Sequence, residues 1–124
     1  MSTATAPADD DRHDGLLGWQ HRLYAGNHTM KSTLIIHLIA VPLFWIGCLS
    51  LVAAPFTSPL VAIGGVGLLL ALVLEGRAHK QEPAAPIPFR GPGDFVARFF
   101  VEQWVTFPRW LLNGGFGKAW REAK

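Results

Sequence analysis

Three histidines are placed around a long apolar run. His28 precedes the run, His37 lies inside it and His79 follows it. Imidazoles are rare in segments built for hydrocarbon, and where they occur they usually belong to a site with a specific partner. Carboxylates lie nearby, and the only cysteine of the chain, Cys48, is within the apolar run. A nitrogen and oxygen donor set suits Fe(II), Mn or Zn, and a cysteine-based metal cluster is excluded.

His28 and His37 can bind one metal only if the helix between them is interrupted. Nine residues of one continuous helix correspond to about 900° of rotation and ~13.5 Å of rise, which places the two side chains on opposite sides. Gly26-Asn27 is a helix-breaking pair, and Ser32 is a good N-cap. The sequence therefore predicts a helix that begins near Ser32, with His28 folding back toward His37.

The third histidine, His79, has carboxylates at helical spacing on either side that could contribute to the same metal site. Glu75, His79 and Glu82 stand at i, i+4 and i+7, on one helical face if the helix continues through all three. This spacing predicts Glu82 as a metal ligand or as the partner of one. Arg77 or Lys80 can pair with a substrate carboxylate, although basic residues at a helix end more commonly contact lipid headgroups.

Charge is distributed unevenly along the 124 residues. Only 16% of them are charged, and residues 34–74 include no Asp, Glu, Lys or Arg. The stretch 34–54 has about the twenty residues that cross a ~30 Å hydrocarbon core, and 56–74 is nearly long enough to return. Basic residues occur on both flanks and not at the tip: Arg12, Arg22, Lys31, Arg77, Lys80 and Arg90. The prediction is an all-α membrane protein in the lipid bilayer, built on a transmembrane hairpin with both termini cytoplasmic.

The segments outside the hairpin complete a single membrane-embedded domain over residues 16–113. Residues 1–15 are expected to be a disordered tail, and residues 114–124 an exposed basic tail. Residues 16–25 predict an interfacial helix, and 95–113 an amphipathic one. On the latter, Arg98 and Glu102 can form an i, i+4 pair that accounts for both as structure. Whether His21, Glu75 or Glu102 joins the site stays open. The net charge of +2 and the absence of a Lys/Arg run exclude nucleic acid as an expected partner.

Two short motifs in this chain resemble the signatures of a known family. They are Tyr24-x-x-x-His28 followed by His37-x-x-Ala40-x-Pro42, and His79-x-x-Glu82 followed by Pro83-Ala84. Both are similar to motifs of the 2-hydroxy-fatty-acid dioxygenase (Mpo-like) family of small multi-pass membrane proteins. Thr33, Ala40 and Ala78 stand where that family usually has Asn, Gly and Gly.

The resemblance implies an Fe(II)-dependent enzyme of fatty-acid α-oxidation. Such an enzyme uses O₂ to shorten a 2-hydroxy long-chain fatty acid by one carbon, and its histidines are needed for iron. On this reading His28, His37 and His79 hold Fe(II), with Glu82 and Arg77 as catalytic residues. The alternative is a non-enzymatic membrane scaffold or lipid-binding protein, because a single histidine near a helix end is more often an interfacial hydrogen-bonding residue than a ligand.

Overall fold

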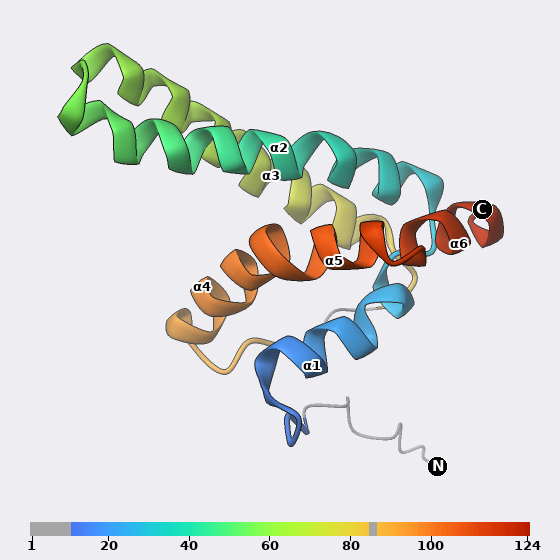
Figure 1. Ribbon diagram of the computed structural model, residues 1–124. Coiled ribbons are helices and arrows are strands. Elements are labelled where there is room, and N and C mark those ends of the chain that lie inside the picture. The colour runs from blue at the N-terminus through green and yellow to red at the C-terminus, as the bar shows by residue number, and fades with distance from the viewer. Residues whose placement is uncertain (1–10, 85–86) are drawn as a thin grey trace.

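The computed structural model describes residues 11–84 and 87–124, and throughout this part of the chain the regular elements are helices (Figure 1). Their order is α1 (Gly15–Leu23), η1 (Tyr24–Asn27), α2 (Lys31–Ala53), η2 (Ala54–Phe56), η3 (Pro59–Gly65), α3 (Val66–Gln81), α4 (Pro92–Val101), η4 (Glu102–Thr106), α5 (Phe107–Leu112) and α6 (Gly115–Glu122). The expected all-α fold is confirmed.

The predicted helical hairpin is present as α2 packed against η3 and α3, with η2 at its tip (Figure 1). Small residues bring the two arms close together. A Cβ atom added to Gly47 would lie 2.6 Å from the Leu68 backbone nitrogen, and one added to Gly67 would lie 2.8 Å from the Leu43 carbonyl oxygen. Contacts this short leave no room for a side chain, so these glycines set the distance between the arms.

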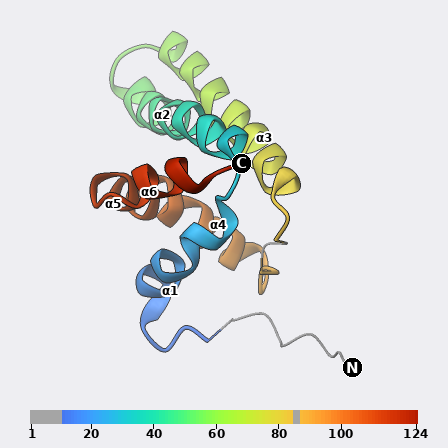
Figure 2. The ribbon, with the colours of Figure 1, turned by 90° about the vertical axis from the view of Figure 1, so that its right-hand side faces the viewer.

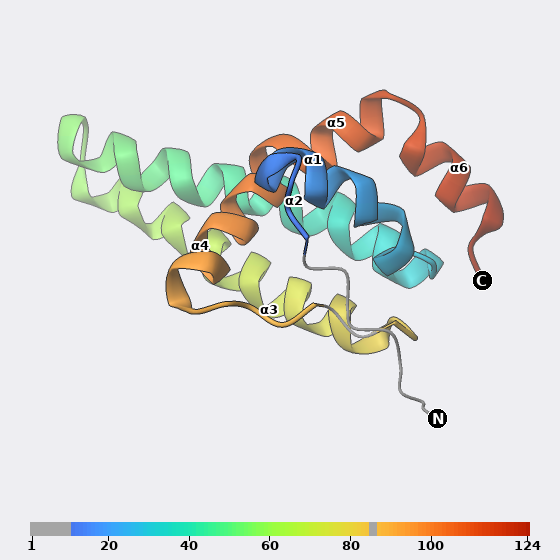
Figure 3. The same ribbon diagram turned by 90° about the horizontal axis from the view of Figure 1, so that it is seen from below.

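Both arms are long and apolar enough to cross a membrane, over Lys31–Phe56 and Pro59–Gln81. Within the most apolar window of each arm, only 28% and 17% of the residues are buried. The tip of the hairpin extends beyond the other helices (Figure 3). The large apolar side chains that the two arms expose include Ile46, Leu49, Val52, Leu69 and Val73. A core helix of a soluble domain is instead largely buried by its neighbours.

The other helices cover only the half of the hairpin that carries its two ends (Figures 1 and 2). The segment α4–η4–α5 crosses α2, with the ring of Phe44 5.2 Å from that of Phe99. Helix α1 packs against α4 and η4, where Gln20 donates a hydrogen bond to the Arg98 carbonyl (2.9 Å) and accepts one from Thr106. These contacts fix α1 and η4 beside the hairpin.

Residues 114–124 contain a helix where an exposed basic tail was expected. Gly114 has φ +93°, a left-handed conformation typical of the residue that follows a helix, and α6 begins directly after it. Phe116 lies over Phe107 and Trp110, with ring centroids 6.2 and 6.0 Å apart. The C-terminal residue also contacts the start of α2, because the Lys124 carbonyl accepts a hydrogen bond from the Lys31 amide (3.1 Å). The segment forms a helix rather than a tail because apolar side chains on one side of α6 pack against α5.

The N-terminal tail prediction falls mainly on residues 1–10, which lie outside the described residues. In the described part, the Arg12 guanidinium forms two hydrogen bonds with Asp94, at 2.6 and 3.0 Å. Asp94 lies in the first turn of α4 and also accepts a hydrogen bond from the Arg90 amide (3.0 Å). This contact attaches the start of α1 to the start of α4.

Candidate metal centre

His28, His37 and His79 come together at the covered half of the hairpin. The ring centroids are 4.5 Å apart for His28 and His37, 6.4 Å for His28 and His79, and 6.3 Å for His37 and His79. Each is below the ~8 Å beyond which three imidazoles cannot share one ion with metal–nitrogen bonds of ~2.0–2.1 Å. The three rings therefore meet at one centre, but among the described residues the groups whose ligand atoms all lie within 4.8 Å of one another place His79 with Glu75 and Glu102, not with His28 and His37 as predicted.

The chain interruption predicted between His28 and His37 makes this convergence possible. Helix α1 ends at Leu23, η1 adds one short turn, and His28 then leaves the helical conformation (φ −134°, ψ 61°). Helix α2 starts at Lys31, and its N-cap is Met30 rather than the expected Ser32. Gly26-Asn27 marks the break correctly, because η1 ends there.

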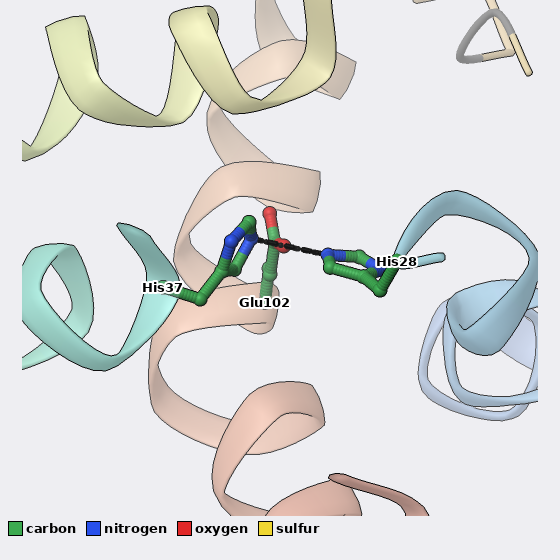
Figure 4. Close-up of side chains that lie close together, drawn as sticks. All are labelled: His28, His37 and Glu102. Carbon is green, nitrogen blue, oxygen red and sulfur yellow. Dashed lines mark hydrogen bonds and ion pairs between the residues drawn. The ribbon is translucent and has the colours of Figure 1, made fainter. Parts of the chain in front are cut away.

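The hydrogen bonds of the two imidazoles define which nitrogen of each ring faces the centre. His28 Nδ1 lies 2.6 Å from the Tyr24 carbonyl oxygen, and His37 Nδ1 lies 3.0 Å from that of Thr33. A carbonyl oxygen only accepts, so both Nδ1 atoms carry the hydrogen, and in the neutral rings both Nε2 atoms carry a lone pair. These two Nε2 atoms are 3.1 Å apart and face each other (Figure 4).

Two buried carboxylates point at the same place. Glu102 Oε2 lies 3.1 Å from His37 Nε2 and 3.7 Å from His28 Nε2 (Figure 4). Glu75 Oε2 lies 2.8 Å from His37 Nε2, yet neither oxygen of this buried side chain receives a hydrogen bond. Tyr24 donates its hydroxyl hydrogen to Glu102 Oε2 at 2.8 Å. The lone pairs of the imidazole nitrogens and of the two carboxylates therefore point at one place, and the Tyr24 hydroxyl donates a hydrogen bond to one of these carboxylates.

Convergent lone pairs in a buried place need a positive charge to hold them together, either a proton or a cation. The ligand atoms of His28, His37 and Glu102 lie within 4.8 Å of one another, and so do those of Glu75, His79 and Glu102. The Nδ1–carbonyl bonds and the Tyr24 hydroxyl are the outer contacts that orient imidazole and carboxylate ligands around metals. The donor set fits a divalent ion such as Fe(II), Mn or Zn.

The charge states of groups outside the hairpin agree with this donor set. Burial lowers the pKa of His28, so its ring favours the neutral form that has a free Nε2 lone pair. Burial alone would raise the pKa of Glu102, but hydrogen bonds and positive charge from His28 and His37 outweigh it and hold that pKa well below its usual range, so without a metal ion a proton on these imidazoles faces the ionised carboxylate. Burial and the nearby carboxylates raise the pKa of Tyr24, which keeps its hydroxyl as a donor.

The sequence left open whether Glu102 joins the site and offered an i, i+4 pair with Arg98 as its structural role. In the structure Arg98 instead lies 3.6 Å from Asp94 and donates to the Pro88 carbonyl at 3.2 Å. Glu102 begins the π-helical segment η4, whose wider turn changes the direction of the side chains around it. The signal in the sequence is a carboxylate isolated among aromatic and aliphatic residues, which favours a site over a solvated pair.

Glu82, predicted as ligand or ligand partner, lies away from the three histidines. Helix α3 ends at Gln81 and Glu82 is extended (φ −70°, ψ 139°), so the expected common face with His79 stops before it. Its carboxylate accepts hydrogen bonds from the Thr29 amide (2.8 Å), the Thr29 hydroxyl (2.7 Å) and the Met30 amide (3.1 Å). Glu82 therefore caps the start of α2 from a distance, in place of a local Ser or Thr.

Arg77 and His21 are also not brought to the centre. Arg77 is exposed and lines a shallow hollow with Ile36 and Lys80 on another side of the hairpin. His21 Nε2 lies 3.3 Å from the Asn113 side-chain amide. Among the described residues, Arg98 is the Lys or Arg that lines the pocket next to the centre.

A pocket of about 270 Å³ extends from the centre between α1, α3 and α4. Its walls include four of the candidate ligands, namely His28, Glu75, His79 and Glu102. The rest of the lining is mostly aromatic and aliphatic: Trp19, Leu23, Leu72, Ile87, Phe89, Phe95 and Phe99. Arg98 also lines this pocket, with its guanidinium over the ring of Phe89 at 4.2 Å. Such a pocket can hold an apolar chain with a polar end at the ligands.

Comparison with known proteins found no matching family model, no matching curated protein and no matching solved structure.

Proposed function

We propose that this protein is a membrane-embedded, metal-dependent oxygenase that acts on 2-hydroxy long-chain fatty acids. The observation that carries the proposal is the convergence of imidazole and carboxylate lone pairs at one end of an apolar pocket. The motif resemblance to the 2-hydroxy-fatty-acid dioxygenase family supplies the substrate class and Fe(II) as the metal. His28, His37 and Glu102 would hold the ion, with Glu75 and His79 close by.

Fe(II) held by these residues would supply the binding and reduction of O₂. In the balanced reaction the bond between the carboxyl carbon and the hydroxyl-bearing carbon breaks. O₂ accepts four electrons from these two carbons, and the products are carbon dioxide, water and an acid shorter by one carbon. No further reductant is required, which agrees with a chain that offers no nucleotide-binding motif.

The protein's own residues would bind and orient the substrate. The aromatic and aliphatic walls of the pocket would receive the acyl chain and exclude water from the ligands. Tyr24 would keep Glu102 in place through its 2.8 Å hydrogen bond. Arg98, the one Lys or Arg among the described residues that line the pocket, would pair with the substrate carboxylate in place of the predicted Arg77.

A membrane location would bring the substrate to this pocket. The uncharged hairpin would span the bilayer, and the other helices would lie at the cytoplasmic surface with both termini. Leu72, exposed on α3, lines the pocket as well, so an acyl chain could pass from lipid into the pocket beside the hairpin. Low burial of both arms supports this placement over a soluble helical pair.

The test is oxygen consumption by protein purified in detergent and loaded with Fe(II). We expect 2-hydroxypalmitate to be converted to pentadecanoate and palmitate to be left unchanged, because only the hydroxy acid has a hydroxyl oxygen that can chelate together with a carboxylate oxygen. The His28→Ala variant should lose activity and metal, and His21→Ala is the matched control with the same change outside the centre. Protein that carries no metal and consumes no O₂ would favour the membrane scaffold instead.

Arg98 can be tested by separating kcat from KM. The Arg98→Gln variant should raise KM for the hydroxy acid about tenfold or more, as expected for a lost charge-assisted contact. Asp94→Asn is the control, because it breaks the same Arg98–Asp94 pair but leaves the guanidinium in the pocket. Equal effects of the two changes would mean that Arg98 acts only in packing.

A further inference from the structure

The candidate ligands form two sets that share one residue. One set contains His28, His37 and Glu102, and the other contains Glu75, His79 and Glu102. Within each set the ligand atoms lie within 4.8 Å of one another, and the described residues form no larger set. Ligands of a single ion lie at most about 4.4 Å apart, twice a bond length of ~2.2 Å. One ion therefore cannot use all five side chains in this arrangement.

The second set has the properties of a site rather than of a packed core. Glu75 is 2% exposed, and neither of its oxygens receives a hydrogen bond. A buried carboxylate that lies at an ion-pair distance of 2.8 Å from His37 Nε2 is costly unless a proton on that imidazole or a metal cation balances its charge. The nearest nitrogen, His37 Nε2, already faces the first set, so the imidazole of His79 and the carboxylate of Glu102 remain to complete a second group around Glu75.

We propose that the centre holds two divalent cations bridged by Glu102, one bound by His28 and His37 and the other by Glu75 and His79. A carboxylate has two oxygens, and bridging two metals ~3.5–4 Å apart is a role for which such a group is suited. This inference rests on the proposed metal-dependent function and extends it. The three residues of the second set all line the pocket, so the second ion would face the substrate.

The summed charge of the ligands and ions is consistent with a role of the second ion in binding the substrate. Neutral imidazoles and two carboxylates carry a charge of −2, so one divalent ion gives a neutral centre and two give +2. An anionic 2-hydroxy acid offsets part of that positive charge through its carboxylate and hydroxyl oxygens. A doubly loaded centre therefore binds the acid more strongly than a singly loaded one, and the ligands from α3 become substrate-binding elements.

The experiment counts ions in metal-free protein titrated with Mn(II) in detergent. We expect two Mn(II) per wild-type chain, with exchange coupling between them visible by electron paramagnetic resonance. His79→Ala should retain one uncoupled Mn(II), and the control His21→Ala should retain two coupled ions. If His79→Ala fails to fold, the stoichiometry and coupling of the wild-type protein decide the question by themselves.

The outcomes separate this inference from the proposed function. Saturation of the wild-type protein at one Mn(II), or two ions bound by His79→Ala, would overturn the two-ion centre. If such a one-ion protein still oxidises 2-hydroxypalmitate when loaded with Fe(II), the proposed function stands without the second ion. Two coupled ions in a protein that does not act on the acid would support the centre and overturn the function.

Discussion

Glu102→Gln should weaken metal binding, and Glu82→Gln should lower stability and leave metal binding nearly unchanged. Both changes replace a buried carboxylate by an uncharged side chain of nearly the same shape. The sequence favoured Glu82 as a ligand or ligand partner and left Glu102 open, whereas in the structure Glu82 contacts the Thr29 amide and Glu102 lies beside His37. The two variants therefore test the central result of the structure directly.

The expected effect of Glu102→Gln follows from its contacts. The carboxylate lies 3.1 and 3.7 Å from the two Nε2 atoms, so the change removes a ligand and one negative charge. Loss of an outer-shell partner typically weakens metal binding ~10–100-fold, and loss of a ligand should cost at least this much. A Gln oxygen can still accept the Tyr24 hydrogen bond, and repulsion from Glu75 is removed. The folded protein nevertheless holds the Glu102 pKa below its usual range, so loss of this charge should also lower the stability of the metal-free protein, and metal affinity is the quantity that separates the two variants.

Glu82→Gln should leave metal affinity within about threefold of wild type and lower stability instead. Glu82 accepts three hydrogen bonds at the start of α2, and a charged acceptor makes each of them stronger than a neutral one. Weaker hydrogen bonds and the lost interaction with the helix N-terminus together cost about 2–4 kcal/mol. The variant should therefore unfold at a lower temperature with and without metal.

The assay is metal titration of detergent-solubilised protein, followed by thermal unfolding of the metal-free and metal-loaded forms. Our assignment requires that affinity falls in Glu102→Gln and that stability falls in Glu82→Gln. Strong loss of metal from Glu82→Gln, with normal binding by Glu102→Gln, would refute the reasoning and return Glu82 to the site. Loss of metal in both would show that the start of α2 and the centre behave as one unit.

Four further outcomes are expected. Gly67→Ala should destabilise the hairpin by ~1–3 kcal/mol because its Cβ meets the Leu43 carbonyl oxygen, whereas Gly76→Ala, which meets nothing within 4 Å, should be neutral or stabilising in thermal unfolding. The hydrogen bond from Arg12 holds the pKa of Asp94 well below its usual range, so the stability that this pair contributes is present above the unfolded-state pKa of ~3.9 and is lost as pH falls below it. Unfolding curves of wild type and Asp94→Asn should therefore converge on acidification; a constant difference would contradict this. Chelation should lower the unfolding free energy by about 2.7 kcal/mol relative to protein at a hundredfold excess of metal over Kd, measured by thermal unfolding in detergent. Reporter fusions at the two termini should both report the cytoplasm, and one external terminus would refute the topology.

The sequence alone predicted the helical hairpin and the approach of His28, His37 and His79 to one another. An uncharged run of this length has few stable arrangements, and the break at Gly26-Asn27 is a local backbone property, so both can be read from neighbouring residues. The membrane itself and the function remain proposals, because composition and motif resemblance restrict them without testing them.

Only the tertiary structure decided which carboxylates join the histidines. Glu82 is three residues from His79, but the end of α3 at Gln81 turns it to the backbone amides of Thr29 and Met30. Glu102 is 65 residues from His37 and reaches it because α4 and η4 cross α2. Such a contact depends on how helices pack and on a local π-helical turn. Neither leaves a periodic pattern in the sequence, which is why the sequence offered Glu102 a pair with Arg98 and left its place in the site open.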